Sequence, residues 1–385
     1  MRVVLVVPGG VGADGVHDVV PALLSLIRRL GAAHDVLVVA TDQIAEADSY
    51  RLEGTRILAL GRRRRGALGR LRLARAAISA IRTFRPDMIH AFWLGPQSTI
   101  AVVAGALSRV PVIASVGGGE LVSLRRQGYG GARTWRGRGH AALALRSAAA
   151  VTAGSTSALD PVRWRRPEAR WLPLGAERDE DPDEPPVRLR DPEPGQTDRP
   201  LRLLVAASIN RVKGPDVVLG AVARARARGT NVELEWLGED TLGGAANALA
   251  RALGIDAAVT CLGFKPHGFV RNAWRTADLA IQGSYHESQG VAVLEAAAAG
   301  VPTVGTAVGL VADLAGAEPA AAVAVPVGDA AALGDAIVAL ALDPDRRARL
   351  GQAARAWAEA RDADWTAAEF TSLYAEVRAT RRFKA

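Results

Sequence analysis

The sequence has few of the residues and runs that would point to several common classes of protein. It contains one cysteine in 385 residues, Cys261, which excludes an internal disulfide and a cysteine-built zinc site. No uninterrupted apolar run reaches the roughly 18 residues of a membrane-spanning helix. The apolar start of the chain is too short, and too soon followed by glycine, for a signal peptide. We therefore expect a cytoplasmic protein without a redox function.

Lysine is also scarce. Only Lys213, Lys265 and Lys384 are lysines, so the net charge of +8 comes almost wholly from arginine. This balance suits anionic partners such as nucleotides, phosphorylated ligands, nucleic acids or anionic lipids, and it also suits a plain solvated surface. Charge alone therefore does not decide between these classes.

Strand-like and helix-like segments alternate along both halves of the chain. Runs such as VVLVV, DMIHAF, LRLLVAAS and DLAIQGS are separated by stretches with apolar residues three and four positions apart. The alternation predicts the α/β class, with doubly wound parallel sheets covered by helices. Residues 177–200 interrupt it with proline and acid, which indicates an exposed linker. We expect domains at 1–176 and 201–360, and a C-terminal helix at 361–385 that packs back on the first domain.

The stretch HESQGVAVLEAAAAGVP, at residues 286–302, carries one carboxylate on an otherwise apolar predicted helix. A buried carboxylate such as that of Glu295 is costly unless it is paired. It therefore needs a dedicated partner, which is an arginine, a backbone amide or a hydroxylated ligand such as a ribose. Glu287 lies in the preceding loop, at the carboxyl end of a predicted strand, where open parallel sheets bind ligands. The amides of Gly290 and Val291 at the helix start favour a phosphate.

The two glutamates, separated by seven residues and followed by EAAAAGVPTVGTAVG, resemble the signature of retaining GT-B glycosyltransferases of family four, the glycosyl transferases group 1. Matching segments extend over nearly the whole chain, including PGGVG, RPDMIHAFW and AASINRVKGPD. The resemblance implies a GT-B fold, in which two Rossmann-like domains face a central cleft. It also implies that Glu295 holds the ribose of a nucleotide-sugar donor and that Glu287 contacts the sugar.

The same segments supply the other candidate residues. Arg211 and Lys213 follow a predicted strand, so both can reach a diphosphate whose charge grows as the sugar leaves. We assign Glu287, Lys213 and Arg211 to catalysis. The residues predicted to bind substrate are Glu295, Gly290, Val291, Gln289, Ser288, Ser208, Asn210, Gly263, Phe264, Lys265, Gly10, Gly12, Gly118, Gly119 and Glu120. Those from Gly263 to Lys265 are expected near the base, and those before residue 121 near the acceptor.

The chain departs from the family pattern in two loops. Many members have a histidine after the fourth strand of the first domain, whereas the loop here is ASVGGGELVSL. Glycines let the backbone approach a ligand closely, and Glu120 is then expected to reach an acceptor hydroxyl. In the second domain Ser208 stands where the family often has an arginine, so either Arg211 substitutes for that arginine or the diphosphate is held differently.

The histidines and acids do not suggest a metal site. His17, His34 and His140 have no metal-ligand spacing, while His90 and His286 either line the cleft or pack. The first domain has no D-x-D-type pair after a strand. We therefore expect neither a metal nor another cofactor.

Residues 62–85 form an arginine-rich segment that continues into a predicted helix. Arg70, Arg72, Arg75 and Arg82 lie along that helix, opposite an apolar set of Leu71, Ala74, Ile78 and Ile81. The basic face contacts anionic lipid at the inner side of a membrane, attracts an anionic acceptor, or is a solvated helix face. Nucleic-acid binding is disfavoured because no aromatic residues interleave with the arginines.

The sequence is therefore interpreted as a retaining, metal-independent glycosyltransferase. The donor is a nucleotide diphosphate sugar, with UDP favoured over GDP, and the acceptor is a small molecule, glycan or glycolipid. Two alternatives stay open, a nucleotide-sugar epimerase of the same fold and a non-catalytic sugar-nucleotide binding protein. A transferase turns over its donor only when an acceptor is present, whereas an epimerase needs no acceptor. A binding protein binds the nucleotide sugar but releases no nucleotide.

Overall fold

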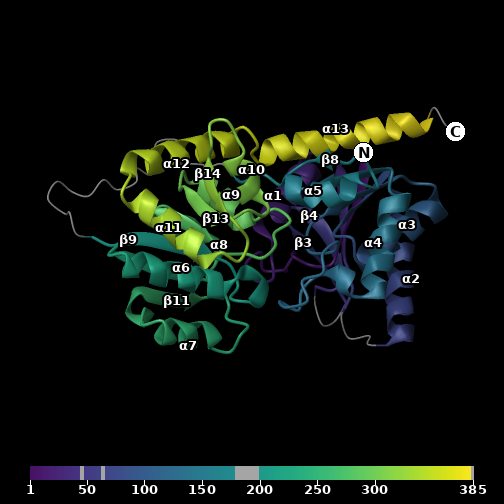
Figure 1. Cartoon of the computed structure of the whole chain (residues 1–385). Coiled ribbons are helices and arrows are strands. Elements are labelled where there is room, and N and C mark those ends of the chain that lie inside the picture. The colour runs from purple at the N-terminus through teal and green to yellow at the C-terminus, as the bar shows by residue number, and fades with distance from the viewer. Residues whose placement is uncertain (44–46, 62–65, 178–198, 383–385) are drawn as a thin grey trace. The chain divides into compact units, whose positions relative to one another are not determined.

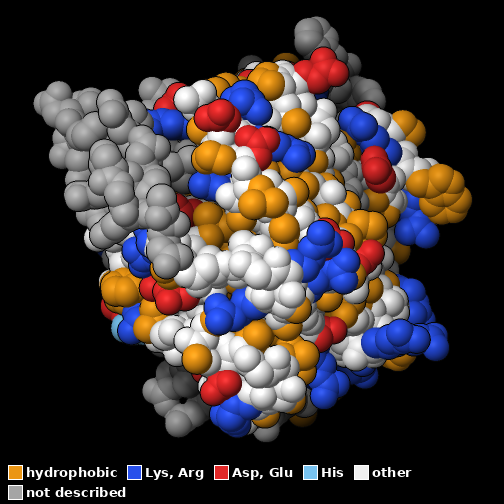
Figure 2. Space-filling view, turned by 60° about the vertical axis from the view of Figure 1, so that its left-hand side comes forward, with side chains coloured by type: hydrophobic (Ala, Val, Ile, Leu, Met, Phe, Trp, Pro, Cys, Tyr) orange, Lys and Arg blue, Asp and Glu red, His pale blue; other side chains and the backbone are white. Residues whose placement is uncertain are grey.

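The computed structural model describes residues 1–43, 47–61, 66–177 and 199–382, in two compact units (Figure 1). The first unit comprises Met1–Gly175 and the chain from Ala363 onward, and the second comprises Ala176–Asp362. Most of the predicted linker and the arginines at 62–65 lie outside the described residues. On the face drawn in Figure 2, basic side chains are interspersed with acidic and apolar ones.

Within its described residues, the first unit forms an eight-stranded sheet in the order β3-β4-β2-β1-β5-β6-β7-β8. The strands are β1 (Arg2–Val7), β2 (Asp35–Ala40), β3 (Asp48–Leu52), β4 (Thr55–Ala59), β5 (Met88–Phe92), β6 (Val112–Val116), β7 (Ala150–Ala153) and β8 (Arg170–Trp171). All neighbours are parallel except β3 and β4, an edge hairpin that the sequence analysis does not predict. The doubly wound class is confirmed for this unit.

Helices cover both faces of this sheet. They are α1 (Pro21–Ala33), α2 (Ala67–Phe84), α3 (Pro96–Ser108), α4 (Trp135–Ser147), α5 (Thr156–Arg163) and α13 (Ala363–Arg382). Alternate residues of β1 point to opposite faces, so Val3 and Leu5 join a core with α1 and α13. Val4 and Val6 join a core with α2 and α3. Every residue of β1 after the first is therefore buried.

The second unit forms, in the part of the chain described, a six-stranded sheet with the order β11-β10-β9-β12-β13-β14, parallel throughout. The strands are β9 (Leu201–Ala206), β10 (Val232–Leu237), β11 (Val259–Gly263), β12 (Leu279–Gln282), β13 (Thr303–Thr306) and β14 (Ala322–Val325). The helices are α6 (Pro215–Ala227), α7 (Ala245–Ala252), α8 (His267–Trp274), α9 (Val291–Ala298), α10 (Leu310–Ala315), α11 (Ala330–Ala341) and α12 (Pro344–Glu359). Cys261 lies half-buried on β11, and burial raises the pKa of its thiol.

The described end of the chain forms two helices, of which α12 packs in the second unit and α13 in the first. One prediction about a helix needs correction. Leu71, placed by periodicity on the packing face of α2, is 47% exposed. The other three predicted residues do pack, since Ile81 is buried and Ala74 and Ile78 lie partly buried against the same core. The remaining buried residues of α2 are Gly69, Ala77 and Phe84.

Each sheet reverses its winding direction once. In the first unit the chain runs outward from β1 through β2 to β4, and then returns to the other side of β1 at β5. In the second unit it runs outward from β9 and returns beside β9 at β12. Loops that follow the two central strands of an open parallel sheet meet at such a switch point, where ligands bind.

Candidate functional site

The switch point of the second unit brings together Lys213 and Glu287, two of the three residues assigned to catalysis. Lys213 follows β9 and Glu287 follows β12. The ammonium Nζ of Lys213 donates to Oε1 of Glu287 at 2.6 Å, and Oγ of Ser284 donates to the same oxygen at 2.8 Å. The Glu287 side chain is 12% exposed and that of Lys213 28% exposed. A carboxylate this well covered keeps its charge at least cost when a cation and a hydroxyl contact it.

Local sequence explains the position of Lys213. Oδ1 of Asn210 accepts from the amides of Val212 and Lys213, both at 3.1 Å, which closes a short turn. Gly214 follows with φ +63°, and a Cβ there would lie 2.1 Å from the carbonyl oxygen of Gly283. Only glycine allows the two loops to approach so closely. Asn210, predicted to bind substrate, therefore shapes the turn that presents Lys213.

Glu295 has a partner that the sequence analysis does not name. Nε2 of His267, the first residue of α8, lies 3.0 Å from Oε1 of Glu295. The Glu295 side chain is 15% exposed, so the carboxylate is well covered but not sealed. The expected arginine or backbone amide is replaced by an imidazole from a neighbouring helix. The signal was available, because HGFVRNAW follows the predicted strand VTCLGF and so begins at the same edge of the sheet.

The helix that carries Glu295 begins and ends as predicted. Gly290 precedes α9 with φ +95°, and Gly300 follows it with φ +73°. At the C-terminus the Gly300 amide donates to Ala297 and the Val301 amide to Ala296, both at 2.9 Å, which is the Schellman arrangement. The N-terminus of α9 directly follows the loop that holds Glu287.

Other candidates of the second unit lie around these pairs. Arg211 and Ser208 are exposed, Gln289 is buried and Ser288 is half-buried. Gly309 packs closely against the loop that holds Glu287, because a Cβ on Gly309 would lie 2.6 Å from Cβ of Glu287. Near the predicted base segment, Gly263 has φ +67°, Phe264 is exposed, and Nζ of Lys265 lies 5.4 Å from the centre of the Phe269 ring.

In the first unit, the carboxylate of Glu120 is held by the backbone. It accepts from the amides of Leu94 at 2.9 Å, Gly117 at 3.2 Å and Gly118 at 2.8 Å. These amides belong to the loops after β5 and β6, so Glu120 ties the two loops together. Three amides donate to this carboxylate, so its position is set by the loops, and its predicted contact with an acceptor hydroxyl stays a prediction.

Contacts within the first unit also explain why several of its loop positions are glycine. A Cβ on Gly118 or Gly119 would lie 3.1 Å from Trp93 or 2.3 Å from Tyr129, respectively. Gly10 adopts φ +84°, and a Cβ on Gly12 would lie 2.0 Å from the carbonyl oxygen of His17. The atoms that a Cβ would meet belong to the protein itself, so these glycines do not by themselves indicate a ligand-binding site.

Beside this glycine loop lies a basic hollow that the sequence analysis missed. It has a volume of about 390 Å³ and is lined by Ser123, Arg125, Ala132, Arg133 and Arg138. Nη1 of Arg138 donates to the carbonyl oxygen of Ala132 at 2.9 Å, and Arg133 donates to that of Gly128. The arginines are close in sequence, and their spacing alone did not distinguish them from a solvated surface.

Among the histidines, His90 is fully buried. Its ring nitrogens lie 2.7 Å from the Tyr374 hydroxyl and 2.7 Å from Oγ of Ser115, which in turn contacts Thr152 at 2.6 Å. Burial lowers the pKa of His90 to about 3 and raises that of Tyr374 above its usual range. Of the two roles left open for His90, the structure therefore supports packing.

Three further histidines have side-chain partners. His17 lies beside Asp14, His34 beside Thr371 and His140 beside Thr99, while His286 is half-buried in the loop after β12. Within the described ranges, no group of three or more histidine, cysteine or acidic side chains is arranged to hold a metal ion. No described helix is long and apolar enough to cross a membrane.

Two family profiles match this chain. The profile described as Glycosyl transferases group 1 matches residues 189–357, and that described as Glycosyl transferase 4-like domain matches residues 15–175. Together they cover both units and the motif that contains Glu287 and Glu295. The chain belongs to the group 1 glycosyltransferases.

Curated relatives of this glycosyltransferase match over part of their length. The D-inositol 3-phosphate glycosyltransferase of Corynebacterium efficiens is 33% identical over 189 residues, which are 46% of this chain and 44% of that protein. The protein of the same name from Arthrobacter is 37% identical over 119 residues, 28% of this chain and 27% of that protein. The matched region thus spans less than half the length of these relatives.

Solved structures are similar to this glycosyltransferase over nearly the whole chain. Anabaena Alr3699/HepE, in complex with UDP and glucose, has a TM-score of 0.75 at 17% identity and covers 98% of this chain and 100% of its own. Sucrose-phosphate synthase from Thermosynechococcus elongatus has a TM-score of 0.73 at 17% identity, covering 98% and 99%. At this identity the likeness establishes the GT-B fold, which confirms the fold expected from the motifs.

Proposed function

We propose that this protein transfers a sugar, with retention of configuration, from a nucleoside diphosphate sugar to an acceptor hydroxyl. The observation that carries the proposal is the Lys213–Glu287 pair at the switch point of the second unit, inside the family motif. The similar Alr3699/HepE structures contain UDP with glucose and UDP-glucose, which supports a uridine diphosphate sugar as donor.

Each residue has a role in this proposal. The cation of Lys213, assisted by Arg211 and by the amides at the start of α9, offsets the charge that builds on the departing diphosphate. Glu287 orients sugar hydroxyls, and Glu295, held by His267, accepts from the ribose. Because these groups meet the diphosphate charge, we propose that no metal or other cofactor is required.

The reaction in this proposal needs no side-chain nucleophile. The bond between the anomeric carbon and the diphosphate oxygen breaks, and a bond from that carbon to the acceptor oxygen forms on the same face. The acceptor proton passes to the departing phosphate oxygen, so atoms and charge balance. Closing water out of the site would protect the donor from hydrolysis.

For the acceptor, we propose a phosphorylated polyol or a related anionic hydroxyl compound. The matched relatives are named for D-inositol 3-phosphate. The hollow lined by Arg125, Arg133 and Arg138 beside the loop after β6 offers cationic donors of the kind that bind phosphate.

We also propose that the protein works in the cytoplasm and contacts the inner face of an anionic membrane. Leu68 and Leu71 on α2 are 72% and 47% exposed, next to Arg70, Arg72 and Arg75. Exposed leucines flanked by arginines suit insertion at a lipid headgroup boundary. Flotation with anionic vesicles tests this, and Leu68→Ser combined with Leu71→Ser should reduce binding; unchanged flotation would refute it.

The activity is tested by a screen of uridine, guanosine and adenosine diphosphate sugars for thermal stabilisation, followed by assays of nucleotide release with and without polyol phosphates. Release that depends on the acceptor supports transfer. Donor turnover without an acceptor would instead indicate an epimerase, and stabilisation without turnover a binding protein.

A further inference from the structure

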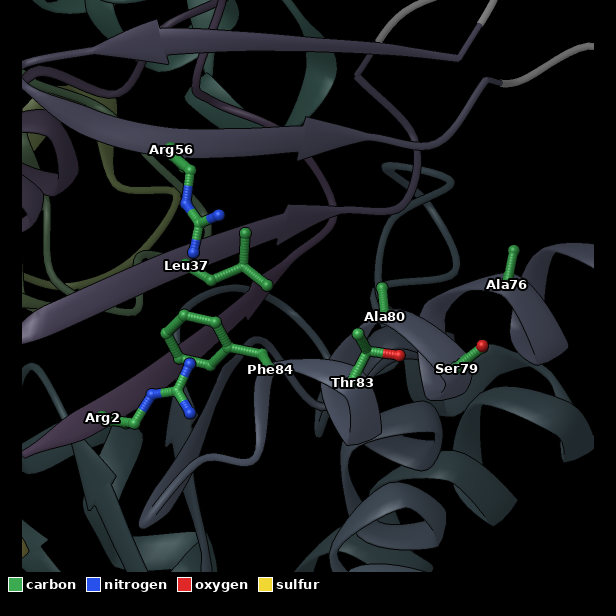
Figure 3. A pocket seen from close by; sticks show the side chains of 8 residues that line it. All are labelled: Arg2, Leu37, Arg56, Ala76, Ser79, Ala80, Thr83 and Phe84. Carbon is green, nitrogen blue, oxygen red and sulfur yellow. The ribbon is translucent and has the colours of Figure 1, made fainter.

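The first unit has a second hollow, at the opposite end of its strands from the loops discussed above (Figure 3). Its volume is about 510 Å³, within the usual size range of small-molecule sites. Arg2, Leu37 and Arg56 line it from β1, β2 and β4, and Ser79, Thr83 and Phe84 line it from α2. Since β1 rises about 3.3 Å per residue, Arg2 lies roughly 17 Å from the loop that follows Val7. The hollow is therefore distinct from the loops at the carboxyl ends of these strands.

The register of the sheet explains why cations gather there. Across the sheet, Ile89, Val4 and Leu37 are direct neighbours, and Leu37 is paired with Arg56 of β4, which is paired in turn with Arg51. Direct neighbours point to the same face, here the face covered by α2 and α3. The row is apolar beneath the helices and becomes cationic toward the edge of the sheet.

Two guanidinium groups share one aromatic ring in this hollow. The guanidinium carbon of Arg2 lies 4.4 Å, and that of Arg56 5.6 Å, from the centre of the Phe84 ring. In Figure 3 the two side chains approach Phe84 from opposite sides. The two guanidinium carbons can be no farther apart than the sum of their distances to the centre of the Phe84 ring, so the two positive charges lie near each other.

The nearby acids offset only part of this charge. Asp35 accepts from Nε of Arg2 at 3.2 Å, and Asp87 accepts from the Arg2 backbone amide and pairs with Arg378 at 3.1 Å. For Arg56, the contact recorded among the described residues is the Phe84 ring. The Arg56 guanidinium therefore offers donors for an anion at the edge of the hollow.

We propose that this hollow binds a small anion that carries a phosphoryl group. Guanidinium groups match phosphate oxygens with paired N–H donors. Ser79 and Thr83, four residues apart on the same face of α2, add two hydroxyls, and Leu37 and Phe84 give an apolar surface for the organic part of the ligand. The anion is either a soluble phosphorylated metabolite or a phospholipid headgroup, and because the hollow lies at the opposite end of the strands from the loops that follow them, the anion acts as a regulator rather than a substrate.

A structural role for the arginines is the rival account. Cations near the C-terminal end of α2 interact favourably with the helix dipole, and their stacking on Phe84 stabilises the fold without any ligand. That account predicts that Arg56→Gln lowers the thermal stability of the protein and leaves phosphate affinity unchanged.

The test is calorimetric titration of the full chain with inorganic phosphate. Arg56→Gln should weaken binding about tenfold, as expected for the loss of a charge-assisted hydrogen bond. Arg51→Gln is the matched control, because Arg51 is the cross-strand neighbour of Arg56 but does not line the hollow. Lys213→Met separates the donor site, since phosphate bound in the hollow should remain in that variant.

Two results decide the proposal. Binding that Arg56→Gln weakens and Lys213→Met leaves intact supports it, and a double Ser79→Ala, Thr83→Ala variant should weaken binding too. Binding that is equal in Arg56→Gln and Arg51→Gln overturns it. Vesicles of phosphatidylcholine with and without phosphatidic acid then identify the source. A headgroup ligand gives flotation that depends on Arg56 and is competed by phosphate, and a soluble ligand gives phosphate binding without such flotation.

Discussion

The two units each have a glutamate in a loop at the carboxyl end of a strand, Glu120 after β6 and Glu287 after β12, and the two carboxylates are held in opposite ways. Glu120 accepts from three backbone amides of its own and a neighbouring loop. Glu287 accepts from the side chains of Lys213 and Ser284. Backbone amides cannot move away without unfolding the loops, whereas a lysine side chain can turn to a phosphate.

This contrast extends to the other buried polar groups. His90 in the first unit contacts Tyr374 and Ser115 and is fully buried, while Glu295 in the second contacts His267 and is partly open. Glu120 and His90 are thus held by groups that are fixed within the first unit, whereas Glu287 and Glu295 of the second unit contact side chains that can turn away when a ligand binds.

The largest expected effect comes from breaking the pair in the second unit. Lys213→Met should lower kcat by about 10²–10³-fold, because an electrostatic contact to the departing diphosphate is lost. Steady-state kinetics with the donor found in the screen measures this. Arg251→Gln, an exposed cation on α7 of the same unit, is the control. Wild-type kcat in Lys213→Met would remove the lysine from the mechanism.

The buried histidine of the first unit should make that unit sensitive to acid. Burial keeps His90 neutral with a pKa of about 3, whereas the unfolded chain binds a proton below about 6.5. The unfolded state is therefore favoured as the pH falls from about 6.5 to about 3, by up to about 1.4 kcal/mol per pH unit. Hydrogen exchange of β5 and β6 amides, followed against pH, measures the loss. His90→Gln should flatten the slope, and an equal slope in both proteins would contradict this.

Removal of the Glu120 carboxylate in the first unit should lower the free energy of unfolding and leave the catalytic rate unchanged. Glu120→Ala leaves three amides without their acceptor, so we expect a loss of about 2 kcal/mol in the free energy of unfolding. Glu120→Gln retains one oxygen and should lie between the alanine variant and the wild type. Denaturant unfolding and activity per folded molecule are measured together. If activity falls while stability is unchanged, Glu120 contacts the substrate and the comparison between the units fails.

The smallest expected effect comes from removing His267 and tests whether this residue positions Glu295. His267→Ala frees the carboxylate of Glu295 to turn, so the KM for the donor should rise about tenfold with kcat less affected, the size of one hydrogen bond to a charged group. His267→Gln, whose amide can also donate, should restore part of the affinity. An unchanged KM in the alanine variant would mean that Glu295 keeps its position without the histidine.

Much of the donor side could be predicted from sequence because its signals are local. The apolar runs identify strands, Gly290 and Gly300 mark the ends of α9, and the carboxylate on that helix stands out against its neighbours. Lys213 is conspicuous as one of three lysines beside a glycine. In each case the residues that matter lie within a few positions of one another.

The sequence by itself therefore determined the α/β class, the family motif and the residues from which the site is built. The tertiary structure decided which of them meet. Lys213 and Glu287 are 74 positions apart, Glu295 and His267 are 28 apart, and His90 and Tyr374 are 284 apart. Such contacts depend on strand order and helix packing, which bring distant segments together. Composition and periodicity describe only neighbours along the chain, so they did not reveal that the amides of Leu94, Gly117 and Gly118 donate to Glu120.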